Sequence, residues 1–184
     1  PAYVSVRPSG SWTQQAKLTA SDALPGDWFG KSVAINGDSA VIGAPLDDDG
    51  GSDSGSAYVF IRTGSNWTQQ AKLTASDALP GDGFGISVSI SGDTAVVGAY
   101  MSDVAEVNSG SGSTYVFVRA SGSWTEQATL TASDAAPTHP FGPSVAISGE
   151  SVVNGPPMDY RGGADSGSSY VSLRPDRPSP AQAP

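Results

Sequence analysis

The residues best suited to chemistry are four aspartates in one short loop. Asp47, Asp48, Asp49 and Asp53 fall in the run Asp-Asp-Asp-Gly-Gly-Ser-Asp. Carboxylate oxygens are the ligands that calcium prefers, and glycines allow a loop to wrap closely around an ion. The run therefore indicates a candidate calcium site. The alternative is a solvated loop whose aspartates accept hydrogen bonds from backbone N–H groups in turns.

Two further positions are candidates for binding and for modification. Trp28, beside Asp27, is replaced by Gly83 in the next copy of the same motif, so the fold does not require a tryptophan there. This pair is a candidate ligand contact. Asn66 opens the sequence Asn-Trp-Thr, which is an acceptor for N-glycosylation. Serine occupies the equivalent positions in the other copies, so coincidence is the alternative.

The same search finds no constellation for catalysis. The chain has no Cys, which excludes thiolate chemistry and a disulfide framework, and its single histidine, His139, has no partner motif. Serine is abundant, but no nucleophile elbow surrounds it. The sequence therefore predicts a protein that is not an enzyme, with calcium as the one candidate cofactor.

Charge and composition narrow the classes of partner. The 184 residues carry a formal net charge of −9, which argues against a nucleic-acid groove and against anionic membrane surfaces. No apolar run is long enough to insert into a membrane. Gly and Pro are frequent and charged residues are few, which is typical of an all-β protein with many turns. The partners we expect are other copies of the chain, an extracellular protein or a glycan.

Internal repetition is the dominant signal in the chain. Trp12, Trp67 and Trp124 recur at nearly equal intervals, and the run from Trp12 to Asp27 is identical to the run from Trp67 to Asp82. We therefore expect repeat units starting near 12, 67 and 124 within a domain of residues 1–174, with an extra terminal strand. Residues 175–184 are rich in Pro, which predicts an extended or disordered tail.

Each unit contains four short apolar or alternating segments. In the second unit these are residues 67–74, 84–90, 94–99 and 114–119. The first alternates apolar and polar residues and indicates a half-buried strand, whereas 94–99 is almost wholly apolar and indicates a central one. Strands this short and this evenly spaced predict a β-propeller-like array of about three four-stranded antiparallel blades.

The units resemble FG-GAP repeats, which form the blades of the integrin α-subunit propeller and occur in many bacterial extracellular proteins. The residues that carry the resemblance are Phe29-Gly30, Gly37-Asp38, Gly43-Ala44-Pro45 and Tyr58-Val59-Phe60, with their counterparts in the later units. The resemblance implies an extracellular or cell-surface location and a non-catalytic role in binding or adhesion.

One known feature of the family does not carry over. Many integrin-type repeats hold calcium in a loop between the first two strands of the blade, but here that connection is only Asn36-Gly37-Asp38. Such a turn cannot surround an ion that needs roughly six to eight oxygen ligands.

Three units are too few for a closed ring, since propellers have roughly four to eight blades. The array is therefore expected to be incomplete as a single-chain ring. The segments around Tyr3 and Tyr170 are the same type of strand, and both carry Ser where internal units carry Phe, at Ser5 and Ser172. These four residues are candidates for assembly with other copies. Two functions are alternatives to a binding or adhesion module. One is a structural subunit of a surface fibre or multimer that uses its surplus strand, and the other is a glycan-binding, lectin-like propeller.

Overall fold

The architecture is built from strands alone. A computed structural model describes residues 1–102, 110–133, 141–155 and 167–173; the expected tail at 175–184 lies outside them. The described residues form thirteen strands and no helix. The first six are β1 (Ala2–Val6), β2 (Thr13–Leu18), β3 (Ser32–Asn36), β4 (Ser39–Ala44), β5 (Ser56–Thr63) and β6 (Asn66–Leu73). The others are β7 (Phe84–Ser91), β8 (Thr94–Ala99), β9 (Ser113–Ala120), β10 (Ser123–Leu130), β11 (Val145–Ser148), β12 (Ser151–Asn154) and β13 (Tyr170–Leu173). The predicted all-β class is confirmed.

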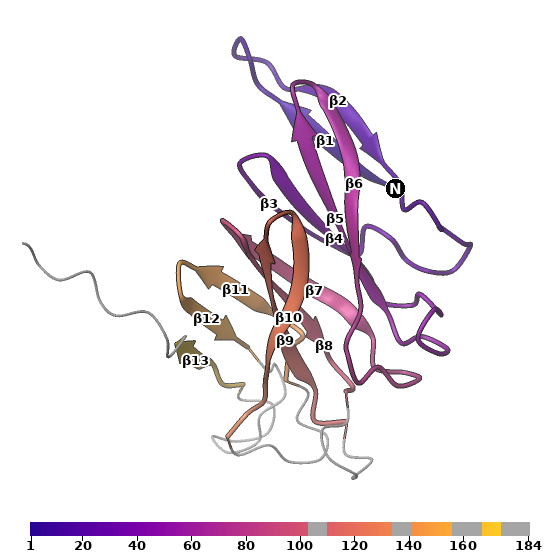
Figure 1. The fold of residues 1–184 in the computed structure, drawn as a ribbon, viewed down its shortest axis with the longest axis vertical. Helices are drawn as coiled ribbons and strands as arrows, with labels where there is room; N and C mark the ends of the chain where they lie inside the picture. The colour runs from indigo at the N-terminus through magenta and orange to yellow at the C-terminus, as the bar shows by residue number, and fades with distance from the viewer. Residues whose placement is uncertain (103–109, 134–140, 156–166, 174–184) are drawn as a thin grey trace, which may run out of the picture.

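The strands form four antiparallel sheets that follow one another along the molecule (Figure 1). Within the described residues, β3-β4-β5-β6 and β7-β8-β9-β10 are complete four-stranded sheets. They are flanked by a two-stranded sheet, β1-β2, and a three-stranded sheet, β11-β12-β13. The two flanking sheets lie at opposite ends of the molecule (Figure 1). The sheets of the described residues do not close into a ring, as the sequence predicts.

Each sheet is offset from the repeat unit of the sequence by one strand. The strand that begins with Trp67 pairs with β5, which precedes it, and not with β7, which follows it. Likewise, the strand containing Trp124 pairs with β9. The strand that opens a sequence unit is therefore the fourth strand of the preceding sheet. By the same order, β1 and β2 occupy third and fourth positions, and β11 to β13 occupy the first three.

Local sequence explains the hairpins and the centre of each sheet. Gly37 and Gly92 turn the chain between the first and second strands with a φ of 57° each, a conformation that glycine adopts without steric cost. The second strands, β4 and β8, are almost wholly buried, as their apolar sequences predict. The fourth strands β6 and β10 lie at the edge and alternate between half-buried and exposed residues.

The repeated glycines let neighbouring sheets approach through their backbones. A Cβ on Gly43 would overlap the carbonyl oxygen of Gly85 in the next sheet, and a Cβ on Gly98 would overlap that of Gly142. Ser32 donates a hydrogen bond of 2.7 Å to the Gly85 carbonyl. The Gly of one unit's Gly-Ala segment and the Gly of the next unit's Phe-Gly segment are thus two sides of one contact, which explains why both motifs recur.

Aromatic and aliphatic side chains fill the space between consecutive sheets. The larger core lies between β3–β6 and β7–β10 and includes Val41, Val59, Phe84 and Phe117. The smaller core joins β1–β2 to β3–β6. In the larger core Phe84 packs edge-on against Tyr115, with 5.4 Å between the ring centroids. The sheets are therefore held by face-to-face packing, as blades are.

Candidate functional site

The predicted acidic loop follows β4, and its first residue is the best anchored. Asp47 is only 3% exposed. Its Oδ1 accepts hydrogen bonds from the Ser56 hydroxyl at 2.8 Å and from the Asp49 backbone N–H at 3.2 Å. Its Oδ2 accepts one of 2.8 Å from the Tyr58 hydroxyl. Strand β5 supplies both hydroxyls, so the adjacent strand fixes the carboxylate of Asp47.

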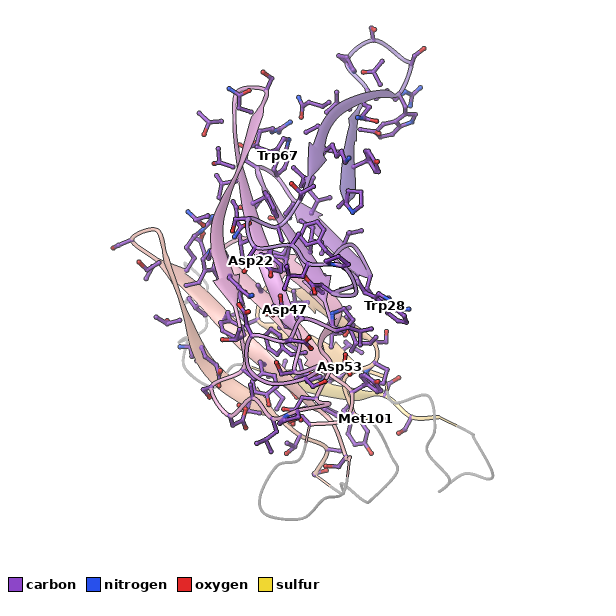
Figure 2. The ribbon with its side chains drawn as sticks, turned by 90° about the vertical axis from the view of Figure 1, so that its right-hand side faces the viewer. Asp22, Trp28, Asp47, Asp53, Trp67 and Met101 are labelled. Atoms are coloured by element: carbon purple, nitrogen blue, oxygen red, sulfur yellow. The ribbon has the colours of Figure 1, made fainter. Side chains whose placement is uncertain are left out.

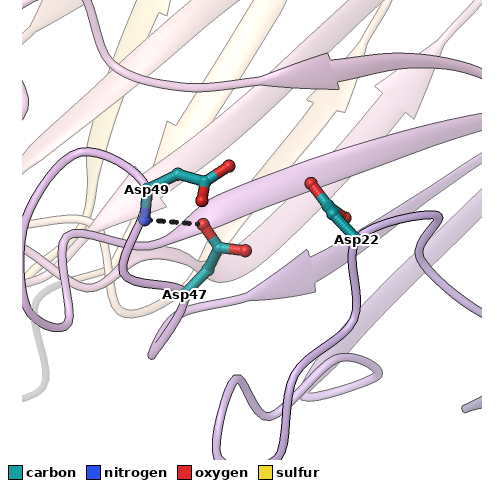
Figure 3. Close-up of side chains that lie close together, drawn as sticks. All are labelled: Asp22, Asp47 and Asp49. Atoms are coloured by element: carbon teal, nitrogen blue, oxygen red, sulfur yellow. Dashed lines mark hydrogen bonds between the residues drawn. The ribbon is translucent and has the colours of Figure 1, made fainter.

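Two other carboxylates lie beside Asp47. Asp49 belongs to the same loop, and Asp22 comes from the loop after β2 (Figures 2 and 3). One carboxylate oxygen from each of the three residues lies within 4.8 Å of the others. We call Asp22, Asp47 and Asp49 the acidic cluster. Its oxygens are close enough to share one cation.

The Lys72 ammonium group occupies the centre of the acidic cluster. Its Nζ lies 2.8 Å from Asp22 and 3.1 Å from Asp47, and it also bonds to Asp49. Lys72 is on β6, with its Nζ 5.2 Å from the centre of the Tyr58 ring. An ion entering this cluster would have to displace the ammonium.

The pKa values of the site reflect this pairing. Burial alone would raise the pKa of Asp47, but hydrogen bonds from Tyr58, Ser56 and Lys72 outweigh it and hold the pKa below its ordinary value. Burial would lower the pKa of Lys72, but hydrogen bonds to the carboxylates raise it instead. Burial, together with the neighbouring carboxylates, raises the pKa of the Tyr58 hydroxyl. All three groups therefore keep their ordinary charge states at neutral pH, which suits a structural ion-pair network.

The remaining predicted metal ligands lie outside the acidic cluster. Asp48 accepts a hydrogen bond of 2.8 Å from the backbone N–H of Asp53. Asp53 has a φ of 54°, in the left-handed region, where aspartate is tolerated in turns. Both are exposed. Of the four predicted ligands, the structure brings Asp47 and Asp49 together with Asp22 and Lys72, and gives Asp48 and Asp53 a role in the turn.

Sequence reasoning missed Asp22, Tyr58 and Lys72, and comparison between units carries the signal that could have found them. In the next sheet, Tyr115 makes the same kind of contacts, to Ser102 at 3.0 Å and to Asp77 at 2.8 Å. There Ser102 stands in place of Asp47, and Thr129 in place of Lys72. The buried acid and its lysine change together between the units, as an interacting pair does.

The structure separates the two members of the predicted binding pair. Asp27 is buried, and its Oδ2 accepts a hydrogen bond of 2.7 Å from the Leu24 backbone N–H. Asp82 repeats this turn with Leu79. Trp28 is 58% exposed at the edge of the molecule (Figure 2). The Lys31 ammonium lies above its ring, 5.4 Å from the ring centre. The φ of 57° at Trp28 is unfavourable for a residue with a Cβ, and Gly83 adopts the same conformation in the next unit.

The remaining predicted positions are all at the surface or in the flanking sheets. Asn66 is exposed at the start of β6, accessible for the predicted glycosylation. Tyr3 and Ser5 lie exposed on β1, whereas Tyr170 and Ser172 are half-buried on β13. Glycosylation of Asn66 and assembly through the other four residues stay predictions. No helix in the described ranges is long and apolar enough to span a membrane.

Successive antiparallel four-stranded sheets, each packed on the next, define a blade-type repeat protein. A family model described as FG-GAP repeat matches residues 12–60, 67–117 and 124–172. The chain therefore belongs to the FG-GAP repeat family, which confirms the resemblance. The family is a non-enzymatic repeat module, and its repeats are generally binding or adhesion repeats of extracellular type. A search of the curated proteins found no match.

Proposed function

We propose that the chain is a non-catalytic extracellular binding or adhesion module that acts in assembly with other copies. The observation that carries this proposal is the three successive FG-GAP matches across residues 12–172. The buried carboxylates add support. Asp47 is engaged with Lys72 and Tyr58, and Asp27 and Asp82 accept hydrogen bonds within their turns, so none of the three is poised for acid–base chemistry.

Trp28 is the residue that we assign to ligand contact. A large apolar ring that is exposed and held in a strained backbone conformation costs the fold about 1 kcal/mol without contributing to its core. Strain of this kind persists where function needs it. Aromatic rings at protein surfaces are also the side chains that most often dominate binding energy.

The test is a binding screen with a matched pair of variants. The immobilised chain is presented to a panel of extracellular-matrix proteins and to a glycan array. We expect saturable binding to a protein, weakened by about 30-fold in Trp28→Gly, since a central aromatic contact contributes about 2 kcal/mol. Leu24→Ala, at another exposed apolar side chain nearby, should leave the affinity unchanged. Binding to glycans alone would establish the lectin alternative, and no saturable binding on either surface would reject the proposal.

We further propose that the acidic cluster is where calcium would bind, in competition with Lys72. Three carboxylates and the hydroxyls of Ser56 and Tyr58 supply oxygen ligands, whereas the ammonium already neutralises part of their charge. Millimolar calcium should therefore raise the melting temperature of Lys72→Met by several degrees and that of the unmodified chain by much less. Equal shifts in the two proteins, or none in the variant, would count against calcium at this cluster.

A further inference from the structure

A groove of about 470 Å³ lies between the β7–β10 sheet and the β11–β13 sheet. Val116, Ala128 and Leu130 line one wall, and Ile147, Val152 and Ser172 line the other. The walls are the faces of two consecutive sheets, and at the other two junctions the matching faces are packed together. The groove is therefore an unfilled part of a contact that the molecule makes twice elsewhere.

Two aromatic side chains fill the matching space at each of the other junctions. Between β3–β6 and β7–β10 they are Phe117 and Trp124, and between β1–β2 and β3–β6 they are Phe60 and Trp67. Ser172 stands where these phenylalanines stand, two residues after the tyrosine of its strand. In the described part of the β11–β13 sheet there is also no fourth strand to bring a tryptophan. Among the described residues, this junction therefore lacks both of the aromatic side chains that fill the other two.

The groove also presents the hydrogen-bond acceptor that a tryptophan uses at the other junctions. The Trp67 indole N–H donates to Gln15 of the preceding sheet at 3.0 Å, and that of Trp124 donates to Gln70 at 2.9 Å. Gln127 occupies the same position on β10 and lines the groove. The matching tryptophan of the series, Trp12, is 70% exposed. One molecule therefore carries both Gln127, at the acceptor position with no tryptophan of the series beside it, and Trp12, whose indole has no glutamine of the series beside it.

The exposed face of β3 and the β11–β12 hairpin are a second pair of surfaces that match each other. Val33 and Ile35 on β3 are 63% and 60% exposed, although Val88 and Ile90, their counterparts on β7, are buried against the preceding sheet. The strands that cover Val88 and Ile90 are β3 and β4, the first and second strands of the preceding sheet. The β1–β2 sheet has only third and fourth strands, so it leaves Val33 and Ile35 open. The β11–β12 pair supplies the missing first and second positions.

We propose that the β1–β2 hairpin of a second copy completes the β11–β12 hairpin, with the partner's β1 taking the position of β13. Trp12 of the incoming copy then enters the groove and donates its indole N–H to Gln127. In return, β11 and β12 cover Val33 and Ile35 of the incoming copy. The partner's β1 can replace β13 with little change in side chains, because the segments at Tyr3 and Tyr170 share the sequence Tyr-Val-Ser followed by an aliphatic residue, Arg and Pro.

The joint has to form between copies, because β1–β2 and β11–β13 lie at opposite ends of one molecule (Figure 1). The β1–β2 hairpin stays packed on its own β3–β6 sheet, and the β11–β12 hairpin stays packed on its own β7–β10 sheet. Only β13 is displaced, and Tyr3 of the incoming β1 takes the place of Tyr170 against Phe141. Every copy contributes two complete sheets and one shared sheet. Two copies joined at both ends would give six sheets, within the range of roughly four to eight found in closed propellers. This inference deepens the assembly part of the proposed function and is independent of which ligand the module binds.

The experiment measures molar mass by light scattering at micromolar concentration for the full chain and three variants. Trp12→Ala removes the incoming ring, and Ala128→Glu places a charge in the groove at an exposed position. We expect the unmodified chain to be a dimer or larger, and both variants to be monomers of 18.5 kDa. A mixture of the two variants keeps one intact groove and one intact Trp12, so it should recover a species of twice that mass. Leu79→Ala, at an exposed apolar side chain outside the joint, should associate like the unmodified chain.

Three results would overturn the proposal. These are an unmodified chain that is monomeric, an oligomer that withstands both Trp12→Ala and Ala128→Glu, and a mixture of these variants that stays monomeric. Circular dichroism and thermal melting of each variant show whether it folds, which separates loss of the joint from loss of the fold. Because the ligand screen and the mass measurement are separate, failure of ligand binding leaves the test of assembly intact.

Discussion

Lys72 binds together three parts of the chain that are distant in sequence. Its ammonium joins the loop after β2, through Asp22, to the loop after β4, through Asp47 and Asp49. The first loop leads from the two-stranded sheet into the next one, so the cluster fastens the junction between two sheets. Ion pairs that are partly shielded from water contribute more than exposed ones, and removing one partner leaves the others uncompensated.

Replacing Lys72 should therefore destabilise the fold. We expect Lys72→Met to lower the free energy of unfolding by about 2 kcal/mol, between the small effect of an exposed pair and the large effect of a buried one. Urea unfolding followed by tryptophan fluorescence measures the change. The matched control is Lys17→Met, at the same position of an identical run but exposed on β2, which should change the midpoint very little. Equal effects of the two substitutions would show that the acidic cluster contributes nothing specific.

The same cluster predicts a pH dependence. The pKa values of Asp22 and Asp47 are lowered from 3.8 in the folded state, so their contribution is complete above that value and is lost as pH falls further. The pKa of Lys72 is raised from 10.5 in the folded state, so its contribution is complete below that value and is lost as pH rises further. The difference in melting temperature between the unmodified chain and Lys72→Met should be constant from about pH 5 to about pH 9 and shrink below about pH 4. A difference that grew on acidification would contradict this assignment.

At the scale of the elements, the contact between glycines sets how closely the sheets stack. Gly43 and Gly98 lie on second strands, and each faces the backbone of the Phe-Gly segment in the next sheet. Gly155 has the same position in the last unit, where Ser144, at 3.8 Å, is the one described residue that a Cβ would meet. The three glycines thus share one position in the repeat but differ in how close the described residues of the neighbouring sheet approach.

This series gives a prediction with an internal control. Gly98→Ala should destabilise the chain by about 2 to 3 kcal/mol, because the added methyl group meets rigid backbone and forces the sheets apart. Gly155→Ala, with room for the methyl group, should change stability by less than about 1 kcal/mol. Thermal or urea unfolding of both variants compares them directly. If both were tolerated equally, close stacking through glycine would not be required.

Sequence predicted the elements well because their signals are local. Apolar alternation, the turn glycines Gly37 and Gly92, and the buried run of β8 all lie within a few residues of the strands they specify. Sequence predicts the pairing of strands less well, because pairing depends on segments that are far apart along the chain. The runs beginning at Trp12 and Trp67 are identical over sixteen residues, yet Trp12 is exposed and Trp67 packs against a core. Sequence shows the loop of Asp47, whereas only the stacked sheets show that Lys72 reaches it.

At the scale of the whole molecule, the joint that we propose brings together chains of like charge. Each copy carries a formal net charge of −9, so association works against electrostatic repulsion. Apolar contacts by Trp12, Val33 and Ile35 supply the attraction, and salt does not weaken them.

Association should therefore strengthen as salt is added. The Debye screening length is about 10 Å at 0.1 M salt and about 30 Å at 0.01 M, so the repulsion reaches less far at the higher concentration. The fraction of dimer at a fixed micromolar concentration should rise between these two conditions, as measured by sedimentation or light scattering. A joint held mainly by ion pairs would show the opposite dependence. Leu79→Ala should follow the unmodified chain throughout.

The offset of one strand between repeat unit and sheet has a consequence for how such a chain can evolve. A duplicated unit brings its opening strand to the sheet before it and its other three strands to the sheet after it. Recombination at the unit boundary therefore adds one complete sheet and leaves no strand without a partner. Such a duplication inside the array leaves the flanking hairpins at its two ends, so the joint that we propose would not be altered by it. The identical runs at Trp12 and Trp67 are what a recent duplication of this kind would leave behind.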